Sequence, residues 1–138
     1  MMENVIEFKN VNKAWKDFRI RNLSMEVKKG FVTGFIGGNG AGKSTTIKMI
    51  MHLLQPDSGS ISLFGLNHAT HEKEIKERIG FVYDESIFYE HITLNEMRKI
   101  IRPAYRNWDD HVFHQYVDAF ELPLHKKLKT LSKGTLMK

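Results

Sequence analysis

The sequence predicts an α/β fold, because segments with strand-like patterns alternate along the chain with segments of helical periodicity. A second indication is a glycine-rich loop that follows a continuous apolar run and precedes an amphipathic segment, which gives the order strand, loop, helix. A third is a change from short strands to longer helical patterns, which predicts a helical insert over residues 86–131. The chain has 138 residues, enough for one domain and too few to favour two independent cores.

The first half of the chain supplies most of the predicted strands. Residues 5–11 and 23–27 alternate apolar with polar side chains, which predicts two half-buried strands in an antiparallel pair. Residues 31–36 are continuously apolar and predict a strand buried on both faces. Over residues 44–54 apolar side chains recur at helical spacing, and the turn beginning at Pro56 ends this predicted helix.

The next segments alternate again. Residues 61–64 and 79–83 predict short strands, and the charged residues 70–78 between them predict a helix. Thr93 and Glu96 then have the spacing of a capping box, which opens a further helix.

Pro103 bends or ends that helix, and Asn107 is predicted to cap the following one. The latter helix carries a stripe of apolar side chains at helical spacing, which predicts core packing or, in part, contact with a membrane partner. The stripe consists of Trp108, Val112, Phe113, Tyr116, Val117 and Phe120.

Composition excludes several classes of function. There is no cysteine, so disulfide frameworks, Cys-ligated zinc, iron–sulfur clusters and thiol catalysis are ruled out. The 21 Lys and Arg against 16 Asp and Glu give a net charge of +5, which suits an anionic partner without specifying one. The N-terminus lacks the pattern of a secretory signal, and no apolar run approaches the roughly 18 residues that span a bilayer, so a cytoplasmic start is expected.

Two other groups of residues were weighed as binding sites. The pairs His68 with His71 and His111 with His114 suggest a metal site, but zinc normally needs three or four convergent ligands, so solvent-facing histidines are predicted. The basic residues 125–129 can meet nucleic acid or anionic lipid, but a hydrated charged turn explains them without a partner and is the prediction. No nucleic-acid partner is expected.

The strongest chemical signal is the glycine-rich loop. Its residues match the phosphate-loop pattern Gly-x-x-x-x-Gly-Lys-[Ser/Thr], and they are Gly37, Gly38, Asn39, Gly40, Ala41, Gly42, Lys43 and Ser44. Glycines allow the backbone to approach a phosphate with its N–H groups pointing inward at a helix N-terminus. Lys43 is predicted to reach the β- and γ-phosphates, Ser44 to ligate Mg²⁺, and Thr45 to donate near the α-phosphate.

Taken with the segments around it, this loop resembles the ATP-binding domain of ABC transporters. The resemblance runs over the whole chain: an antiparallel opening, the turn from Leu53 to Ile61, and Leu131-Ser132-Lys133-Gly134 at the place of the family's signature sequence. It implies an α/β P-loop NTPase core with an N-terminal antiparallel β-subdomain and a helical insert. The implied layout is a single incomplete domain, with residues 1–85 as β-rich core, 86–131 as insert and 131–138 as signature.

The resemblance also implies roles for single residues. Trp15 occupies the position of the family's adenine-stacking aromatic, with Phe18 as a neighbouring rival and a buried core tryptophan as the alternative. Ser132 and Gly134 are implied to contact the γ-phosphate held by a second, head-to-tail ATP-binding domain. Asp84 stands where the family has a glutamine and is implied to sense Mg²⁺. Glu85, the next residue, is an alternative for that role. The remaining alternative is that Asp84 is an acidic surface residue without a role in metal binding.

Departures from the family pattern limit the expected activity. Lys133 replaces the usual glycine and either aids ATP capture or is simply solvated. The family's acidic Walker B strand, catalytic glutamate and switch histidine have no counterpart here, so the chain alone is expected to be a poor or inactive ATPase. The open edge of residues 31–36 predicts self-association.

The implied function is MgATP binding that closes two such domains and powers transport through separate transmembrane subunits. The expected location is cytoplasmic, peripheral on the inner face of the cell membrane. A regulatory or translation-associated module of the same superfamily is the alternative, and a GTPase or small kinase is a third. The guanine-reading Asn-Lys-x-Asp is missing, since Ala14 and Trp15 follow Asn12 and Lys13.

Overall fold

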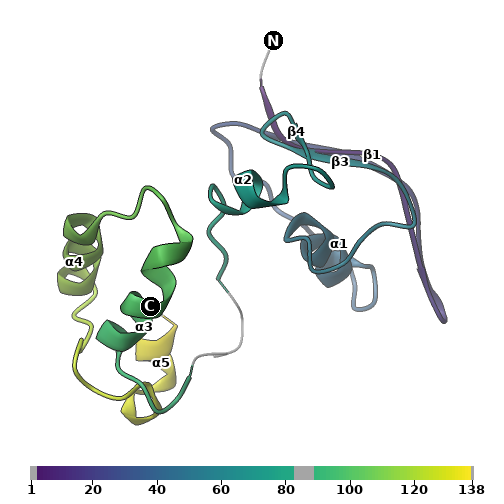
Figure 1. The fold of residues 1–138 in the computed structure, drawn as a ribbon. Helices are drawn as coiled ribbons and strands as arrows, with labels where there is room; N and C mark the ends of the chain where they lie inside the picture. Colours follow the sequence, from purple (N-terminus) through teal and green to yellow (C-terminus); the bar gives the residue numbers. More distant parts are fainter. Residues whose placement is uncertain (1–2, 83–88, 138) are drawn as a thin grey trace. The chain divides into compact units, whose positions relative to one another are not determined.

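The computed structural model describes residues 3–82 and 89–137, and the chain divides into two compact units, residues 1–79 and residues 80–138. The first unit contains a sheet and two helices, and the second is helical (Figure 1). In the part of the chain that the structure describes, no helix has the length and hydropathy required to cross a lipid bilayer.

The sheet of the first unit is antiparallel throughout, with the strand order β2-β1-β3-β4. Its strands are β1 (Asn4–Trp15), β2 (Phe18–Lys28), β3 (Ser58–Leu63) and β4 (Leu66–Asn67). The predicted antiparallel opening is confirmed: β1 and β2 form a hairpin whose tip pairs Trp15 with Phe18 across two residues. The first of these, Lys16, has a φ of 45°, the left-handed conformation that such short hairpin turns require.

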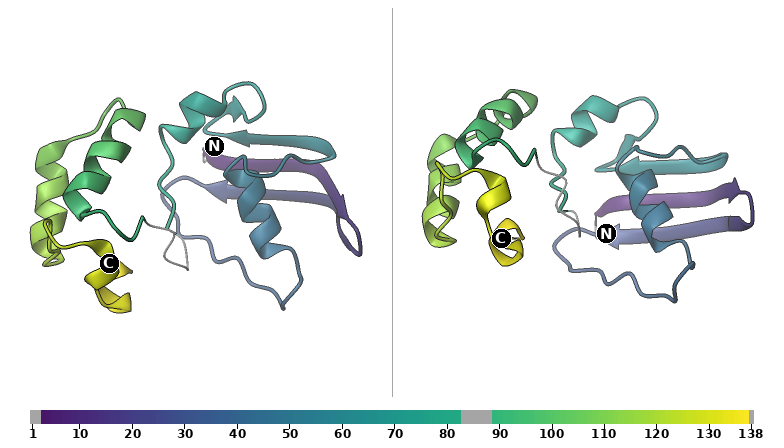
Figure 2. Two further views of the ribbon diagram at one scale, coloured as in Figure 1. Left: turned by 60° about the horizontal axis from the view of Figure 1, so that its bottom comes forward. Right: turned by 90° about the horizontal axis from the view of Figure 1, so that it is seen from below.

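Two helices, α1 (Lys43–Ile50) and α2 (Glu72–Lys76), pack on one face of this sheet (Figures 1 and 2). The register of β1 against β3 pairs Phe8 with Ile61, so both side chains point to that face. The buried core formed there consists of Phe8, Val11, Met49, Ile61, Leu63 and Ile75. The helix predicted over residues 70–78 is therefore confirmed in a shorter form.

Helix α1 ends four residues earlier than the apolar periodicity of residues 44–54 predicts. His52 adopts a left-handed φ of 55°. The amide of Leu53 donates to the Lys48 carbonyl at 2.9 Å, and the amide of His52 donates to the Met49 carbonyl at 3.1 Å. This pair of bonds is the Schellman C-cap, which stops a helix even where the apolar pattern continues.

The buried strand predicted over residues 31–36 and the short strand predicted over residues 79–83 are wrong for the residues described. Residues 31–36 and 79–82 are extended or irregular and pair with no strand in the described parts of the chain, while residue 83 lies outside them. Val32 and Ile36 are fully exposed, at 102% and 96%, and Phe31 is 61% exposed. A central strand is formed by hydrogen bonds to strands on both sides. The sheet described here is built from other parts of the sequence and offers residues 31–36 no such partner.

The second unit begins with α3 (Leu94–Ile101), which opens on the predicted capping box. The Thr93 hydroxyl accepts from the Glu96 amide at 3.2 Å, and the Glu96 carboxylate accepts from the Thr93 amide at 2.7 Å. At Pro103 the helix tightens into a short 3₁₀ turn, η1 (Arg102–Ala104). Both predictions are confirmed.

Helix α4 (Asp110–Ala119) follows, and its predicted cap is wrong. Asp109, not Asn107, caps it: one Asp109 oxygen accepts from the amides of His111 and Val112 at 2.7 and 3.2 Å. The first residue of α4 is Asp110, whose carboxylate accepts a hydrogen bond from the Trp108 indole at 2.8 Å. The N-cap position is the residue before it, which is Asp109 and not Asn107. The unit closes with η2 (Leu128–Thr130) and α5 (Lys133–Leu136).

The apolar stripe on α4 is only partly core, which corrects the prediction. Val117 is buried, and Trp108 and Phe113 are half-buried with ring centroids 5.6 Å apart. Val112, Tyr116 and Phe120 are 42%, 60% and 42% exposed. A helical unit of this size has too little chain to cover both sides of the stripe.

One histidine is also misplaced by the sequence analysis. His71, His111 and His114 are exposed as predicted, but His68 is only 4% exposed. Its Nε2 lies 2.9 Å from the Ile50 carbonyl, so this nitrogen carries the proton. The His52 ring lies beside it, with centroids 4.3 Å apart. His68 thus joins the end of α1 to the loop after β4.

This buried imidazole predicts a loss of stability in acid. Burial lowers the pKa of His68, an effect opposed by its bond to the Ile50 carbonyl and by Glu72, and reinforced by His52 and Lys76. Above about pH 6.5 the unfolded and folded states both hold a neutral His68. As the pH falls below that value the unfolded chain binds a proton that the folded chain resists, so stability falls, by at most about 1.4 kcal/mol per pH unit.

We therefore expect His68→Gln, which retains an N–H donor for the Ile50 carbonyl, to flatten the decline of the free energy of unfolding between about pH 7 and pH 5. Urea denaturation followed by circular dichroism measures this slope. His71→Gln, at an exposed histidine nearby, is the matched control and should keep the wild-type slope. Equal slopes in wild type and His68→Gln would contradict the assignment.

Candidate functional site

The glycine-rich loop is placed directly before α1 in the first unit. Gly40 and Gly42 have φ values of 80° and 92°, which are left-handed conformations that favour glycine. Asn39 and Gly40 form a turn that the Ala41 amide closes by donating to the Gly38 carbonyl at 3.2 Å. The backbone therefore turns back on itself before the helix starts.

The first backbone amides of α1 have no side-chain cap. The first bond of the helix is donated by the Thr46 amide to the Gly42 carbonyl at 2.8 Å, so the amides of Lys43, Ser44 and Thr45 precede the helical ladder. No side chain caps this end of the helix. Uncapped amides together with the helix dipole favour an anion at this position.

Two side chains of the loop can serve such an anion. The Lys43 ammonium donates to the carbonyls of Gly37 and Gly38 at 2.6 and 2.8 Å, so it is folded back across the loop. Ser44 is exposed at the first turn of α1, and Thr45 is half-buried beside it. A cation, an available hydroxyl and free amides are the groups that phosphate oxygens and Mg²⁺ require.

The tip of the β1–β2 hairpin contacts the same loop. A side chain at Gly42 would lie 2.8 Å from the Phe18 ring and 3.3 Å from Ile20, so both residues of β2 pack against this glycine. Trp15 pairs with Phe18 and therefore projects from the same face of the hairpin. It is 59% exposed, which leaves its indole free of the core while Phe18 is half-buried.

A carboxylate that the sequence analysis treated only as part of a turn also binds this hairpin. Asp57 accepts from the Lys13 ammonium at 2.6 Å and from the Ala14 amide at 2.7 Å. The Lys13 bond, then the Ala14 bond, hold the pKa of Asp57 below its usual range. The sequence signal available was the placement of an acid in the turn that follows Pro56, which indicates local structure but not a distant partner.

The predicted signature residues lie in the second unit. Ser132 caps α5, and its hydroxyl accepts from the Thr135 amide at 3.1 Å. The helix begins at Lys133, directly after its cap. Gly134 has open space around it: among the described residues, the nearest atom to an added side chain is the Ser132 hydroxyl at 3.9 Å.

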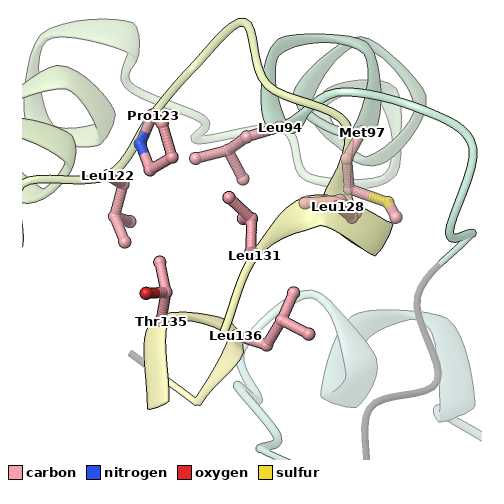
Figure 3. Close-up of a pocket in the computed structure, with 8 residues that line it drawn as sticks. All are labelled: Leu94, Met97, Leu122, Pro123, Leu128, Leu131, Thr135 and Leu136. Carbon is pink, nitrogen blue, oxygen red and sulfur yellow. The ribbon is translucent and has the colours of Figure 1, made fainter. Parts of the chain in front are cut away.

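Apolar side chains anchor this segment within its unit. They line a cavity of about 230 Å³ whose labelled residues come from α3, from the segment after α4 and from the signature segment (Figure 3). The lining residues are Leu94, Met97, Leu122, Pro123, Leu128, Leu131, Thr135 and Leu136. Leu131 and Leu136 flank Ser132 and Gly134, so packing on both sides holds the polar pair at the surface.

The structure does not place every predicted site residue. Asp84 and its alternative Glu85 lie outside the described residues, so the predicted metal-sensing position stays a prediction. Lys133 is exposed, which suits either of its two interpretations. Within the first unit the structure brings together Trp15 and the loop from Gly37 to Thr45 through the contact of Phe18 with Gly42.

Comparison with known proteins identifies a matching family. A family profile described as "ABC transporter" matches residues 20–138. The bacitracin transport ATP-binding protein BcrA of Bacillus licheniformis is 38% identical over 96 residues, which are 69% of this chain and 31% of that protein. The ABC transporter ATP-binding protein YtrB of Bacillus subtilis is 29% identical over 131 residues, 94% of this chain and 44% of that protein.

Two solved structures of ABC transporter ATP-binding proteins also resemble this chain. The structure of an ATP-binding subunit of an ABC transporter matches with a TM-score of 0.83 at 26% identity, over 96% of this chain and 58% of that one. A putative ABC transporter ATP-binding protein from Pyrococcus furiosus matches with a TM-score of 0.75 at 28% identity, over 95% of this chain and 64% of that one. The chain thus spans less than half of the curated relatives' length and about three fifths of the structural ones.

Proposed function

The chain belongs to the ABC transporter family, and from this premise we propose that it binds MgATP as part of an ATP-binding subunit that powers transport through separate membrane subunits. Membership of the family implies nucleotide binding and an α/β P-loop NTPase fold with an antiparallel subdomain. The observation that carries the proposal is the N-terminus of α1, which has no side-chain cap, whose first three amides precede the helical ladder, and which begins with Lys43.

Each group in the first unit then has a role toward the nucleotide. The amides of residues 43–45 and the ammonium of Lys43 bind the phosphates, and nucleotide entry replaces the carbonyls of Gly37 and Gly38 as partners of Lys43. Trp15 stacks on adenine, for which its exposed indole is suited. Mg²⁺ fits Ser44, whose exposed hydroxyl is an oxygen ligand, and Asp84 is proposed as the second metal-binding group.

The partners proposed are a second ATP-binding domain and transmembrane subunits. The second domain would place its nucleotide against Ser132 and Gly134. Gly134 supports this, because no packing among the described residues requires a glycine there, whereas close approach of a phosphate to the backbone does. Homologues named as transport ATP-binding proteins support the membrane partner. A peripheral location on the inner face of the cell membrane is proposed together with that partner.

Equilibrium binding tests this function. Calorimetry on the folded chain should detect binding of MgATP and weaker binding of MgGTP, since an indole stacks on either base but the resemblance implies adenine. Trp15→Ala should weaken MgATP by about tenfold, because stacking of a base on an aromatic side chain is worth about 1–3 kcal/mol.

Trp15→Phe keeps an aromatic face and is the matched control, which should retain most of the affinity. No heat from MgATP on a sample shown to be folded by circular dichroism would overturn the proposed function. An unchanged affinity in Trp15→Ala would remove Trp15 from the site.

A further inference from the structure

The Asp57 carboxylate joins the turn after α1 to the strand that ends in Trp15. One of its oxygens accepts from the Lys13 ammonium at 2.6 Å, and the other accepts from the Ala14 amide at 2.7 Å. Ala14 precedes Trp15 directly in the chain. A bond to its amide therefore fixes the backbone at the point where the indole branches from the strand.

The turn that carries Asp57 is itself firmly held against β1. The Asp57 amide donates to the Asn12 carbonyl at 2.8 Å, and the Asn12 side-chain amide donates to the Ser58 hydroxyl at 3.0 Å. The Asn12 side-chain oxygen accepts from the amide of Asn22 on β2 at 2.9 Å. This network ties the turn to both strands of the hairpin, so Asp57 is a fixed point and not a mobile surface acid.

Trp15 lies between two anchors. On one side its hairpin partner Phe18 packs on Gly42 of the phosphate-binding loop. On the other side the Ala14 amide is bound by Asp57. The indole itself is 59% exposed, so its own packing gives it little restraint, and these two anchors set its direction.

We propose that Asp57 is a positioning residue for Trp15 and sets the affinity for the base of the nucleotide without touching it. This inference rests on the proposed function, in which Trp15 stacks on adenine. When the indole is already held in the orientation that binds the base, the hairpin tip does not have to be ordered on binding. The conformational entropy cost of that ordering would otherwise weaken the complex. The phosphate contacts at α1 do not depend on this link.

Comparison of two probes tests the proposal: MgATP, and magnesium tripolyphosphate, which has the phosphates without the base. In the full chain with Trp108→Phe, Trp15 is the single tryptophan reporter. Asp57→Ala should weaken MgATP by about fivefold and leave tripolyphosphate within about twofold, because the two hydrogen bonds of the carboxylate, to Lys13 and to the Ala14 amide, are lost at the hairpin only. Asp57→Asn still offers an oxygen to the Ala14 amide and should restore most of the ATP affinity.

Glu3→Ala is the matched control, since it removes an exposed carboxylate bound to Lys29 at 2.7 Å. It should leave both affinities unchanged. An equal weakening of ATP and tripolyphosphate by Asp57→Ala would overturn the proposal in favour of a general structural role. An unchanged ATP affinity would overturn it as well.

A measurement without ligand separates this inference from the proposed function. In Asp57→Ala, acrylamide should quench Trp15 fluorescence more strongly than in wild type, and the anisotropy of Trp15 fluorescence should be lower. Asp57→Asn and Glu3→Ala should keep the wild-type values of both. Absence of ATP binding in wild type would refute the proposed function alone, while unchanged quenching in Asp57→Ala would refute the positioning role alone. Should Asp57→Ala fail to fold, Asp57→Leu supplies the same comparison, because leucine fills the place of the carboxylate and offers no acceptor to Lys13 or to the Ala14 amide.

Discussion

Lys43→Met is expected to weaken binding of MgATP by about 100-fold, since a hydrogen bond to a charged group is worth about 1.5–3 kcal/mol and Lys43 provides more than one. Methionine preserves the length and the apolar stem of the side chain, so the loss reports the ammonium. In the structure this ammonium donates to the carbonyls of Gly37 and Gly38. The substitution therefore also removes two hydrogen bonds within the loop.

Calorimetry with MgATP and with magnesium tripolyphosphate measures the effect, and both ligands should weaken together because Lys43 contacts phosphate and not the base. Lys48→Met, five residues further along α1 on its exposed side, is the matched control and should bind as wild type does. An affinity for ATP that is unaffected by Lys43→Met would show that the phosphate loop does not bind the nucleotide. That result would contradict the proposed function.

Gly59→Ala is expected to lower the free energy of unfolding of the first unit by about 3 kcal/mol. Gly59 has a φ of 89°, a conformation that costs other residues about 1–2 kcal/mol. An added Cβ would lie 2.5 Å from the Asn10 carbonyl oxygen and 2.6 Å from the Val11 Cα, which are backbone atoms that cannot move aside without shifting β1. Overpacking of this kind costs about 1–3 kcal/mol more.

Urea denaturation monitored by circular dichroism measures this loss. Gly65→Ala is the matched control: Gly65 has a similar φ of 78°, but no atom lies within 4 Å of an added Cβ, so the expected loss is about 1 kcal/mol. Equal losses in the two variants would show that the close approach to β1 has no energetic weight. Because Gly59 lies in β3 two residues after Asp57, Gly59→Ala should also weaken the link to Ala14.

Sequence reasoning succeeded where structure is set locally. The capping box of Thr93 and Glu96 is visible in four consecutive residues, and its bonds form among those same residues. The hairpin of β1 and β2 and the glycine-rich loop before α1 likewise depend on neighbours in the chain. The place of the glycine-rich loop directly before α1 was therefore predictable from sequence, while the phosphate-binding roles of its residues stay predictions.

It failed where the outcome depends on distant residues. The apolar residues 31–36 were predicted as a buried strand, but apolar character cannot supply the hydrogen-bonding partner that makes a strand. His68 is buried because the end of α1 lies above it, which no pattern around His68 indicates. Asp57 bonds to residues more than forty positions away, so a turn motif could not reveal its partner.

In the described part of the chain, the two flanks of the loop that ends in Lys43 differ in how they pack against the rest of the first unit. Its C-terminal half continues into α1 and is clamped where Phe18 and Ile20 meet Gly42, whereas its N-terminal half follows the exposed residues 31–36. Capturing a chain of phosphates must then immobilise that looser flank, and the conformational entropy lost lowers the affinity. A β-strand that added to residues 31–36 would stiffen the loop in advance and tighten nucleotide binding without a single new contact to the nucleotide.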